Sequence, residues 1–355
     1  MEIFRAQPCI TSEISQRKDF QDRFDPALKG TALPEARLTL EQLSEQFRQA
    51  ELAGDPWKQG IALNNLGSYY KDRREFPSAV SYFQKALEFF TALDDNEKKA
   101  TVLINLGGTY LDEKEHGKAL EQFAMALGTY ASLDHPFGQG MALNNMGGVH
   151  LTLRRYEDAR NQFILAASFF RSAKAAPWEG QALENEAAAE AGIGDIENAV
   201  QSYGRALEIW QRLENHERQA LIMNRLAALH SSRGDRRRAL DLHARALTLA
   251  HKGKNVALSA ATRTSMAKLY FEVGNLNAAR AEFQAALISY EELRDKRGQA
   301  TALLHLGKID IATGHDMIAT AAKMFREAGD AEGEQSALEV LPAREQAEAA
   351  KDKPA

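Results

Sequence analysis

Apolar and small side chains recur along this sequence with a period typical of helices. Ala79, Phe83, Ala86 and Leu87 fall at i, i+4, i+7 and i+8, which places them on one face of a helix with 3.6 residues per turn. The same kind of spacing is seen downstream at Ala119, Phe123, Ala126 and Leu127, and upstream at Leu63, Leu66, Gly67 and Tyr70. The pattern predicts pairs of amphipathic helices.

A longer period of 40 residues is superimposed on the helical one. Copies of the pattern start at Trp57, Glu97, Phe137, Pro177, Glu217 and Ala257, with a seventh at Arg297. A small residue recurs in the first helix of each copy, at Gly67, Gly107, Gly147, Ala187, Ala227, Ala267 and Gly307. An alanine recurs in the second, at Ala79, Ala119, Ala159, Ala199, Ala239 and Ala279. Small residues at fixed positions favour two helices that cross at short distance, and the period predicts a repeat protein.

The turn between the two helices of a copy carries a glycine in the later copies. We expect Gly194, Gly234, Gly274 and Gly314 to adopt the left-handed conformation that ends a helix. The first three copies place charged residues there instead, such as Arg73 and Arg74.

The two ends of the sequence depart from the repeat. Leu40, Leu43, Phe47 and Ala50 predict one amphipathic helix that covers the first copy. In the seventh copy the second-helix pattern slips to Ala321, Phe325 and Ala328, and a capping helix is predicted from Gly333, Ala337, Leu338 and Leu341. We therefore expect an irregular or disordered leader at 1–36, a repeat domain at 37–341 and a disordered tail at 342–355.

The spacing of Leu66, Gly67 and Tyr70, followed by Ala79, Phe83 and Ala86, resembles the tetratricopeptide repeat. The usual repeat has about 34 residues, and the longer copies here resemble those of spindle-orientation scaffolds, kinesin light chain and bacterial peptide-pheromone receptors. The resemblance implies an all-α, right-handed superhelical solenoid of about seven helix pairs with capping helices at both ends, whose first helices line a concave side. Arg263 departs from the pattern because leucine holds its position in the first four copies.

A ladder of amides occupies the positions that face inward in that family. It comprises Asn65, Asn105, Asn145 and Asn185, with Asn64, Asn144 and Asn224 one residue earlier and Arg225 continuing the ladder in the fifth copy. An asparagine side chain both donates and accepts hydrogen bonds, so a row of them can pair with the backbone of an extended peptide. Such ladders grip bound peptide in relatives, and the resemblance implies the same here. The alternative is that the amides hold neighbouring first helices together.

Charge reverses between the fourth and fifth copies. The fourth has 8 acidic residues against Arg205 and Arg212, and the fifth has 9 basic residues against 3 acidic ones. Candidate charged patches are Glu184, Glu186 and Glu190 in the fourth copy, and Arg233, Arg236, Arg237 and Arg238 at the turn of the fifth. We expect Glu186, which replaces an apolar residue, to lie near Arg225 or at a groove wall. The arginines could meet an acidic partner or RNA phosphates, or form a solvated turn.

Composition excludes several classes of function. The formal net charge of −5 does not favour nucleic acid as a partner. Cys9 is the only cysteine, so neither an internal disulfide nor a cysteine-based metal cluster can form. No signal peptide and no apolar run of membrane-spanning length is evident, which predicts a cytoplasmic protein without membrane insertion. Motifs of enzymes and of cofactor binding are missing, so we expect neither catalysis nor a cofactor.

The sequence therefore predicts a cytoplasmic adaptor that binds a peptide or an extended segment of a partner protein in a concave groove. Two alternatives stay open, namely a peptide-sensing regulatory protein and a self-assembling scaffold. The sequence leaves the oligomeric state and the identity of the partner undefined.

Overall fold

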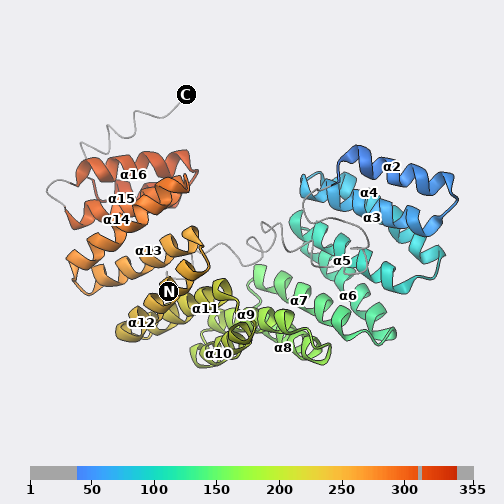
Figure 1. Cartoon of the computed structure of the whole chain (residues 1–355), viewed down its shortest axis with the longest axis horizontal. Coiled ribbons are helices and arrows are strands. Elements are labelled where there is room, and N and C mark those ends of the chain that lie inside the picture. Colours follow the sequence, from blue (N-terminus) through green and yellow to red (C-terminus); the bar gives the residue numbers. More distant parts are fainter. Residues whose placement is uncertain (1–37, 311–313, 342–355) are drawn as a thin grey trace. The chain divides into compact units, whose positions relative to one another are not determined.

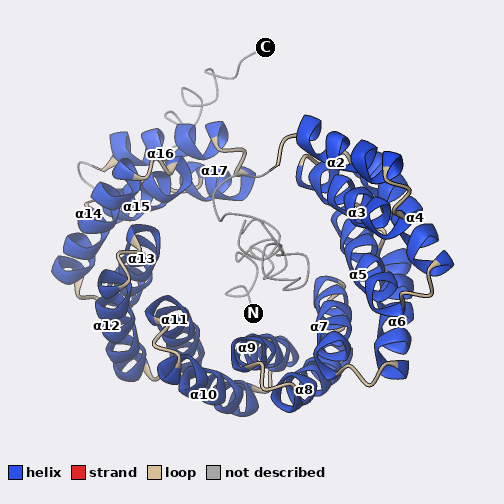
Figure 2. Ribbon diagram, turned by 45° about the vertical axis from the view of Figure 1, so that its right-hand side comes forward, coloured by secondary structure: helices blue, strands red, loops and turns tan. Residues whose placement is uncertain are grey.

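A computed structural model of the chain describes residues 38–310 and 314–341, and all regular structure within these ranges is α-helical. Sixteen helices follow one another in antiparallel succession (Figures 1 and 2), and no strand occurs in the described ranges. The predicted leader at 1–36 and tail at 342–355 lie outside the described residues.

Seven helix pairs follow an initial single helix and precede a final one. The initial helix is α2 (Leu40–Leu52). The pairs are α3 (Pro56–Asp72) with α4 (Phe76–Ala92), α5 (Asn96–Asp112) with α6 (His116–Ser132), α7 (Pro136–Thr152) with α8 (Tyr156–Ser172), α9 (Ala176–Ile193) with α10 (Ile196–Arg212), α11 (His216–Ser232) with α12 (Arg236–Lys252), α13 (Val256–Glu272) with α14 (Leu276–Glu292), and α15 (Lys296–Ile309) with α16 (His315–Glu327). The final helix is α17 (Ala331–Leu338). We call α3, α5, α7, α9, α11, α13 and α15 the first helices and their partners the second helices.

Nearly every helix is bounded by the same three-residue turn. A residue in the left-handed conformation follows every helix except α15 and α17, at Gly54, Arg74, Asp94, Lys114, Asp134, Arg154, Lys174, Gly194, Glu214, Gly234, Lys254, Gly274, Arg294 and Gly329. The next residue is often an aspartate or asparagine that caps the following helix, as Asp95 does by accepting the N–H of Lys98 at 3.0 Å. The prediction is confirmed for Gly194, Gly234 and Gly274.

The prediction is wrong for Gly314, whose φ is −87°. Gly314 is the N-cap of α16 and not the residue that ends α15. The shorter α15 stops at Ile309, so the 20-residue spacing of the turns ends before this point.

The two helices of a pair touch through a glycine and an aromatic ring. A β-carbon placed on Gly67, Gly107 or Gly147 would lie 2.7, 2.6 or 2.6 Å from the ring of Phe83, Phe123 or Phe163. These rings are at most 1% exposed. The recurring small residue of the first helix therefore leaves room for the ring of the second helix, as the spacing predicts.

The chain divides into two compact units, Met1–Ala206 and Leu207–Ala355, which are described separately. In the first unit, each of the helices α3, α5 and α7 contacts the next first helix along the chain. In the second unit, α11 contacts α13 and α13 contacts α15. First helices therefore form a layer of their own within each unit.

The helices at the two ends cover the outermost pairs, as predicted. Leu43 and Ala50 of α2 are buried, and Phe47 packs against the core cluster of α3 and α4. At the other end, Phe325 of α16 and Ala337 of α17 belong to one buried cluster.

Arg263, at the position held by leucine in the first four copies, forms an ion pair with Glu282 at 2.7 Å. Its charge is thereby matched inside the α13–α14 pair.

We expect Gly107→Val to destabilise the first unit by about 1 to 3 kcal/mol, because the new side chain would overlap the Phe123 ring. The measurement is urea unfolding followed by circular dichroism at 222 nm. Gly128→Val is the matched control, since nothing lies within 4 Å of a β-carbon at Gly128 of α6. Equal midpoints for the two variants would contradict the role assigned to the glycine–ring contact.

Candidate functional site

Asparagine side chains of the first unit join consecutive first helices in pairs. Asn105 of α5 donates from Nδ2 to Oδ1 of Asn64 on α3 at 2.9 Å. Asn185 of α9 donates in the same way to Asn144 of α7 at 3.1 Å. Each pair spans 41 residues, which is one repeat plus one position. Four of the predicted site residues are thus hydrogen-bonded to one another in two separate pairs.

Burial separates these amides into two groups. Asn64, Asn144 and Asn185 are only 3%, 8% and 4% exposed. Their pairing supplies hydrogen bonds that a buried carboxamide would otherwise lack. Asn64, Asn144 and Asn185 therefore act within the fold, in line with the alternative in which the amides hold neighbouring helices.

Three amides of the ladder keep contact with solvent. Asn65, Asn105 and Asn145 are half-buried and occupy equivalent positions on α3, α5 and α7. Asn65 and Asn145 have no hydrogen-bond partner among the described residues, and Asn105 uses one of its two N–H donors on Asn64. The unused donors and acceptors of these three side chains are available to a bound chain. We call this row of three amides the amide face.

Asn224 of the second unit belongs to a closed polar network. Its Oδ1 lies 2.8 Å from Nδ1 of His243, and its Nδ2 donates to Oγ1 of Thr262 at 2.7 Å. Thr262 in turn donates to the carbonyl oxygen of Leu258. Burial lowers the pKa of His243 to about 4, so the imidazole is neutral at pH 7 and donates from Nδ1 to Asn224. The side chain of Asn224 is therefore already hydrogen-bonded within the protein. The adjacent residue Arg225 is half-buried.

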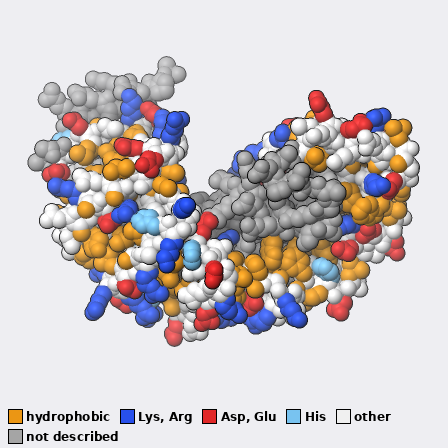
Figure 3. Space-filling model, in the orientation of Figure 1, with side chains coloured by type: hydrophobic (Ala, Val, Ile, Leu, Met, Phe, Trp, Pro, Cys, Tyr) orange, Lys and Arg blue, Asp and Glu red, His pale blue; other side chains and the backbone are white. Residues whose placement is uncertain are grey.

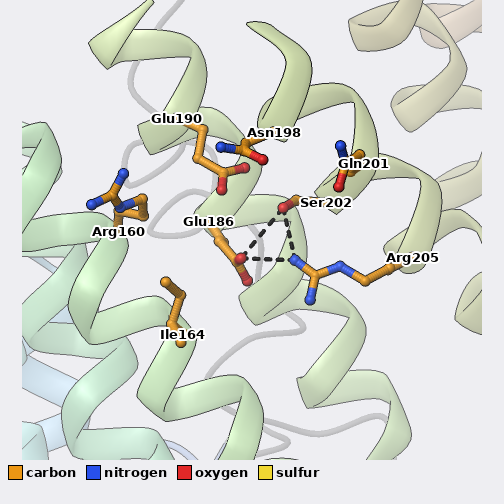
Figure 4. A pocket seen from close by; sticks show the side chains of 8 residues that line it. All are labelled: Arg160, Ile164, Glu186, Glu190, Asn198, Gln201, Ser202 and Arg205. Atoms are coloured by element: carbon orange, nitrogen blue, oxygen red, sulfur yellow. Dashed lines mark hydrogen bonds and ion pairs between the residues drawn. The ribbon is translucent and has the colours of Figure 1, made fainter. Parts of the chain in front are cut away.

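The carboxylates of α9 lie in the interior of the first unit. Glu184, Glu186 and Glu190 are 4%, 5% and 5% exposed. Glu186 accepts from Arg205 of α10 at 2.8 Å and from Ser202 at 3.3 Å (Figure 4). The partner of Glu186 is therefore Arg205, whereas the sequence suggested a position near Arg225 or at a groove wall. Burial raises the pKa of Glu190, and the charge of Glu186 adds to this effect.

Arginines of the fifth copy gather at an exposed turn. Arg233 follows α11, and Arg236, Arg237 and Arg238 open α12. All four side chains are exposed, and none forms an ion pair with another residue in the described ranges. Charged side chains of both signs also lie elsewhere on the surface of each unit (Figure 3). The cluster has the character of a solvated turn.

Sequence reasoning missed Ser202 and Arg205 as neighbours of the buried carboxylates. The available signal was Glu186 itself, a polar residue at a position that holds leucine or methionine in the other copies. No group of three or more potential metal ligands occurs among the described residues. None of the described helices combines the length and the apolar character needed to cross a membrane.

Comparison with known families decides what kind of repeat this is. A tetratricopeptide repeat model matches residues 59–132 and 178–252. The matched segments contain the glycine–ring contacts of the first pairs and the helix pairs α9–α10 and α11–α12. These two segments are tetratricopeptide repeats. The described helices form an all-α solenoid of such repeats, with 40 residues per copy.

Solved structures share this tetratricopeptide fold at low sequence identity. Aspartyl phosphate phosphatase F from Bacillus subtilis is 18% identical, with a TM-score of 0.58, over 96% of this chain and 86% of that one. BtubC (BKLC) from P. vanneervenii is 18% identical, with a TM-score of 0.56, over 65% and 94% of the two chains. The apo form of the quorum sensor NprR from B. thuringiensis is 12% identical, with a TM-score of 0.52, over 85% and 97%.

Curated protein sequences give no significant match. The structural likeness concerns the fold of the tetratricopeptide repeats alone. One of the similar structures carries the name of a phosphatase, so the fold is found in proteins of more than one activity.

Loss of an amide partner should cost stability in the first unit. We expect Asn144→Ala to destabilise it by about 1 to 3 kcal/mol, because the buried amide of Asn185 loses its acceptor. Asn145→Ala is the matched control, since Asn145 is half-buried and has no partner among the described residues. Urea unfolding measures both, and the pairing would have no structural role if the two variants unfolded at the same midpoint.

Stability of the second unit should fall in acid because of His243. The folded pKa of about 4 lies below the unfolded value of about 6.5, so the unfolded state binds more protons between these values. The neutral imidazole of His243 therefore makes its full contribution to the free energy of unfolding above pH 6.5. This contribution is lost as the pH falls toward 4, by about 1.4 kcal/mol per pH unit.

His243→Phe is the variant that tests this, because phenylalanine holds the equivalent position in α14 at Phe283. We expect its urea midpoint to fall less than that of the wild type between pH 7 and pH 4.5. Parallel pH profiles for the two proteins would show that His243 is not the group responsible.

Proposed function

We propose that the chain is an adaptor that binds an extended segment of a partner protein along the amide face of the first unit. The observation that carries the proposal is the row of half-buried amides at Asn65, Asn105 and Asn145. They stand on three consecutive first helices at intervals of 40 residues. Their free donors and acceptors suit the N–H and C=O groups of an extended chain, which has no internal hydrogen bonds.

The buried amides support this use of the exposed ones. The Asn64–Asn105 pair fixes α5 against α3, and an ion pair between Lys71 and Asp112 at 3.4 Å joins the same two helices. Side chains held by a rigid scaffold lose little freedom on binding, which improves affinity. The Asn105 carboxamide is thus oriented before a ligand arrives.

Hydrogen bonds alone do not give a stable complex here. Three of them at about 1 kcal/mol each would supply about 3 kcal/mol, short of the roughly 8 kcal/mol of a micromolar complex. Side-chain contacts must therefore add to the backbone contacts. Ile61, one turn before Asn65, is a half-buried apolar residue on the same helix that can provide such a contact.

The fold agrees with a peptide ligand without identifying one. One similar structure is described as a quorum sensor, and another is a Rap protein complexed with Competence and Sporulation Factor. At identities of 12% and 16% these support the fold, and the ligand of this chain has to be found by experiment.

Selection from a random peptide display library, followed by binding measurements with the enriched peptides, tests the proposal. We expect the triple variant Asn65→Ala, Asn105→Ala and Asn145→Ala to weaken binding roughly 100-fold, which corresponds to about 3 kcal/mol. Methylation of alternate backbone nitrogens in the peptide should weaken binding to the wild type as well, because it removes the N–H groups that would donate to the asparagine Oδ1 atoms.

Asn161→Ala on the second helix α8 is the control, since Asn161 is exposed and lies outside the amide face. Its affinity should equal that of the wild type. Thermal unfolding checks that the triple variant is folded. Peptides that bind the folded triple variant as tightly as the wild type would refute the amide face as the binding site.

A further inference from the structure

A depression opens between the second helices α8 and α10 of the first unit, with the first helix α9 as its floor (Figure 4). Its volume is about 450 Å³. Glu186, Glu190 and Ser202 form the floor, while Arg160, Ile164, Asn198, Gln201 and Arg205 form the rim. None of these residues belongs to the amide face, so this site is separate from the proposed peptide site.

The depression lies where the first helix pair has two packed aromatic rings. In the first pair, Tyr70 and Tyr82 stack with their ring centroids 5.2 Å apart. The equivalent residues of the fourth pair, 120 positions later, are Glu190 and Ser202. A carboxylate and a hydroxyl thus stand where the first pair has two stacked rings, which leaves space and polar groups in the fourth pair.

One of the two floor carboxylates is satisfied within the protein. Glu186 accepts from Arg205 at 2.8 Å, and Arg205 also donates to Ser202 at 2.8 Å. Half of the Arg205 side chain is exposed, so it reaches Glu186 from the rim. This ion pair neutralises Glu186.

The other floor carboxylate, Glu190, interacts with Ser202 but keeps one oxygen without a donor. Glu190 is 5% exposed, and its Oε2 has no hydrogen-bond partner among the described residues. Arg160 stands at the rim but makes no ion pair with Glu190, and its own Nε is buried without a partner. A buried carboxylate oxygen without a donor is costly, and a cationic donor that enters the depression removes this cost.

The surroundings of the depression fit a side chain carried by a protein. Ile164 at the rim is 44% exposed and offers an apolar surface for the methylene stem of a long basic side chain. An exposed apolar residue at the rim of a polar pocket is typical of protein–protein contact.

Guanidinium suits this site better than ammonium. A planar guanidinium forms two parallel hydrogen bonds with one carboxylate, and it loses less hydration on burial than an ammonium group. We propose that the depression between α8 and α10 is a second binding site, which receives an arginine side chain of a partner protein on the Glu190 carboxylate.

The experiment titrates the full chain, labelled at isoleucine methyl groups, with N-acetyl-L-arginine amide and follows the δ1 methyl resonance of Ile164 by NMR. We expect a saturable shift of Ile164 and no shift of Ile222 in the second unit. N-acetyl-L-citrulline amide has the same outline without the charge, and it should bind at least tenfold more weakly. Equal binding of the two probes would overturn the proposal.

Glu190→Gln should abolish the shift of Ile164, whereas Glu197→Gln, at an exposed position of α10, should leave it unchanged. The glutamine fits the same space and carries no charge, so we expect the variant to fold. Retained binding in folded Glu190→Gln would exclude Glu190 as the receptor. Binding that arises only in Arg160→Ala would show that Arg160 itself fills the site, and this too would overturn the proposal.

A peptide distinguishes a protein partner from a free guanidinium compound. Acetyl-Leu-Gly-Arg-Gly-Leu-amide adds apolar residues that can extend the contact with Ile164 at the rim, and it should bind at least fivefold more tightly than the single-residue probe. The same affinity for both would contradict a partner protein as the occupant. Because the readout lies outside the amide face, the result is independent of the proposed adaptor function.

Discussion

The close contact between a glycine of the first helix and an aromatic ring of the second helix determines the geometry on which the other features depend. At Gly107 the Phe123 ring occupies the space of an absent side chain, which fixes how near the two helices approach and how they are rotated. Repetition of this contact at Gly67, Gly107 and Gly147 keeps equivalent positions of α3, α5 and α7 in line. Without that alignment, Asn64 and Asn105 would not meet, and the half-buried amides would not form a row.

The distinctive chemistry arises where a copy departs from the repeat. Most departures are matched within the same helix pair by a residue 19 positions later: Glu186 with Arg205, Asn224 with His243 and Arg263 with Glu282. A polar residue placed between packed helices needs such a partner, because an unsatisfied group costs more than a hydrogen bond gains. The repeat thus tolerates polar residues in its interior when they occur as pairs, and these pairs give each copy an identity that the shared pattern lacks.

The sequence predicted the helices well and the side-chain partners poorly, for physical reasons. Periodicity reports which face of a helix is buried, so the helix pairs, the capping helices and the small crossing residues followed from residues such as Ala79 and Gly107. Gly314 was misplaced because α15 ends early at Ile309, which no local signal reveals. Asn105 pairs with Asn64, and Glu186 with Arg205 where Arg225 was considered, because pairing depends on the rotation of one helix against another. Repeat spacing alone does not supply that angle.

Glu190 is the departure that does not follow the rule of paired substitution. Its neighbour Glu186, one turn earlier on α9, has an arginine and a serine as partners, whereas Glu190 Oε2 has none among the described residues. Tyrosine at this position, as in Tyr70, packs against a second ring and needs no charged partner. Replacing it by glutamate therefore weakens the interior of the fourth pair unless something outside that pair supplies the missing donor. A carboxylate that is costly when empty and stabilised when bound is the physical signature of a binding group, and this asymmetry distinguishes Glu190 from the structural pairs around it.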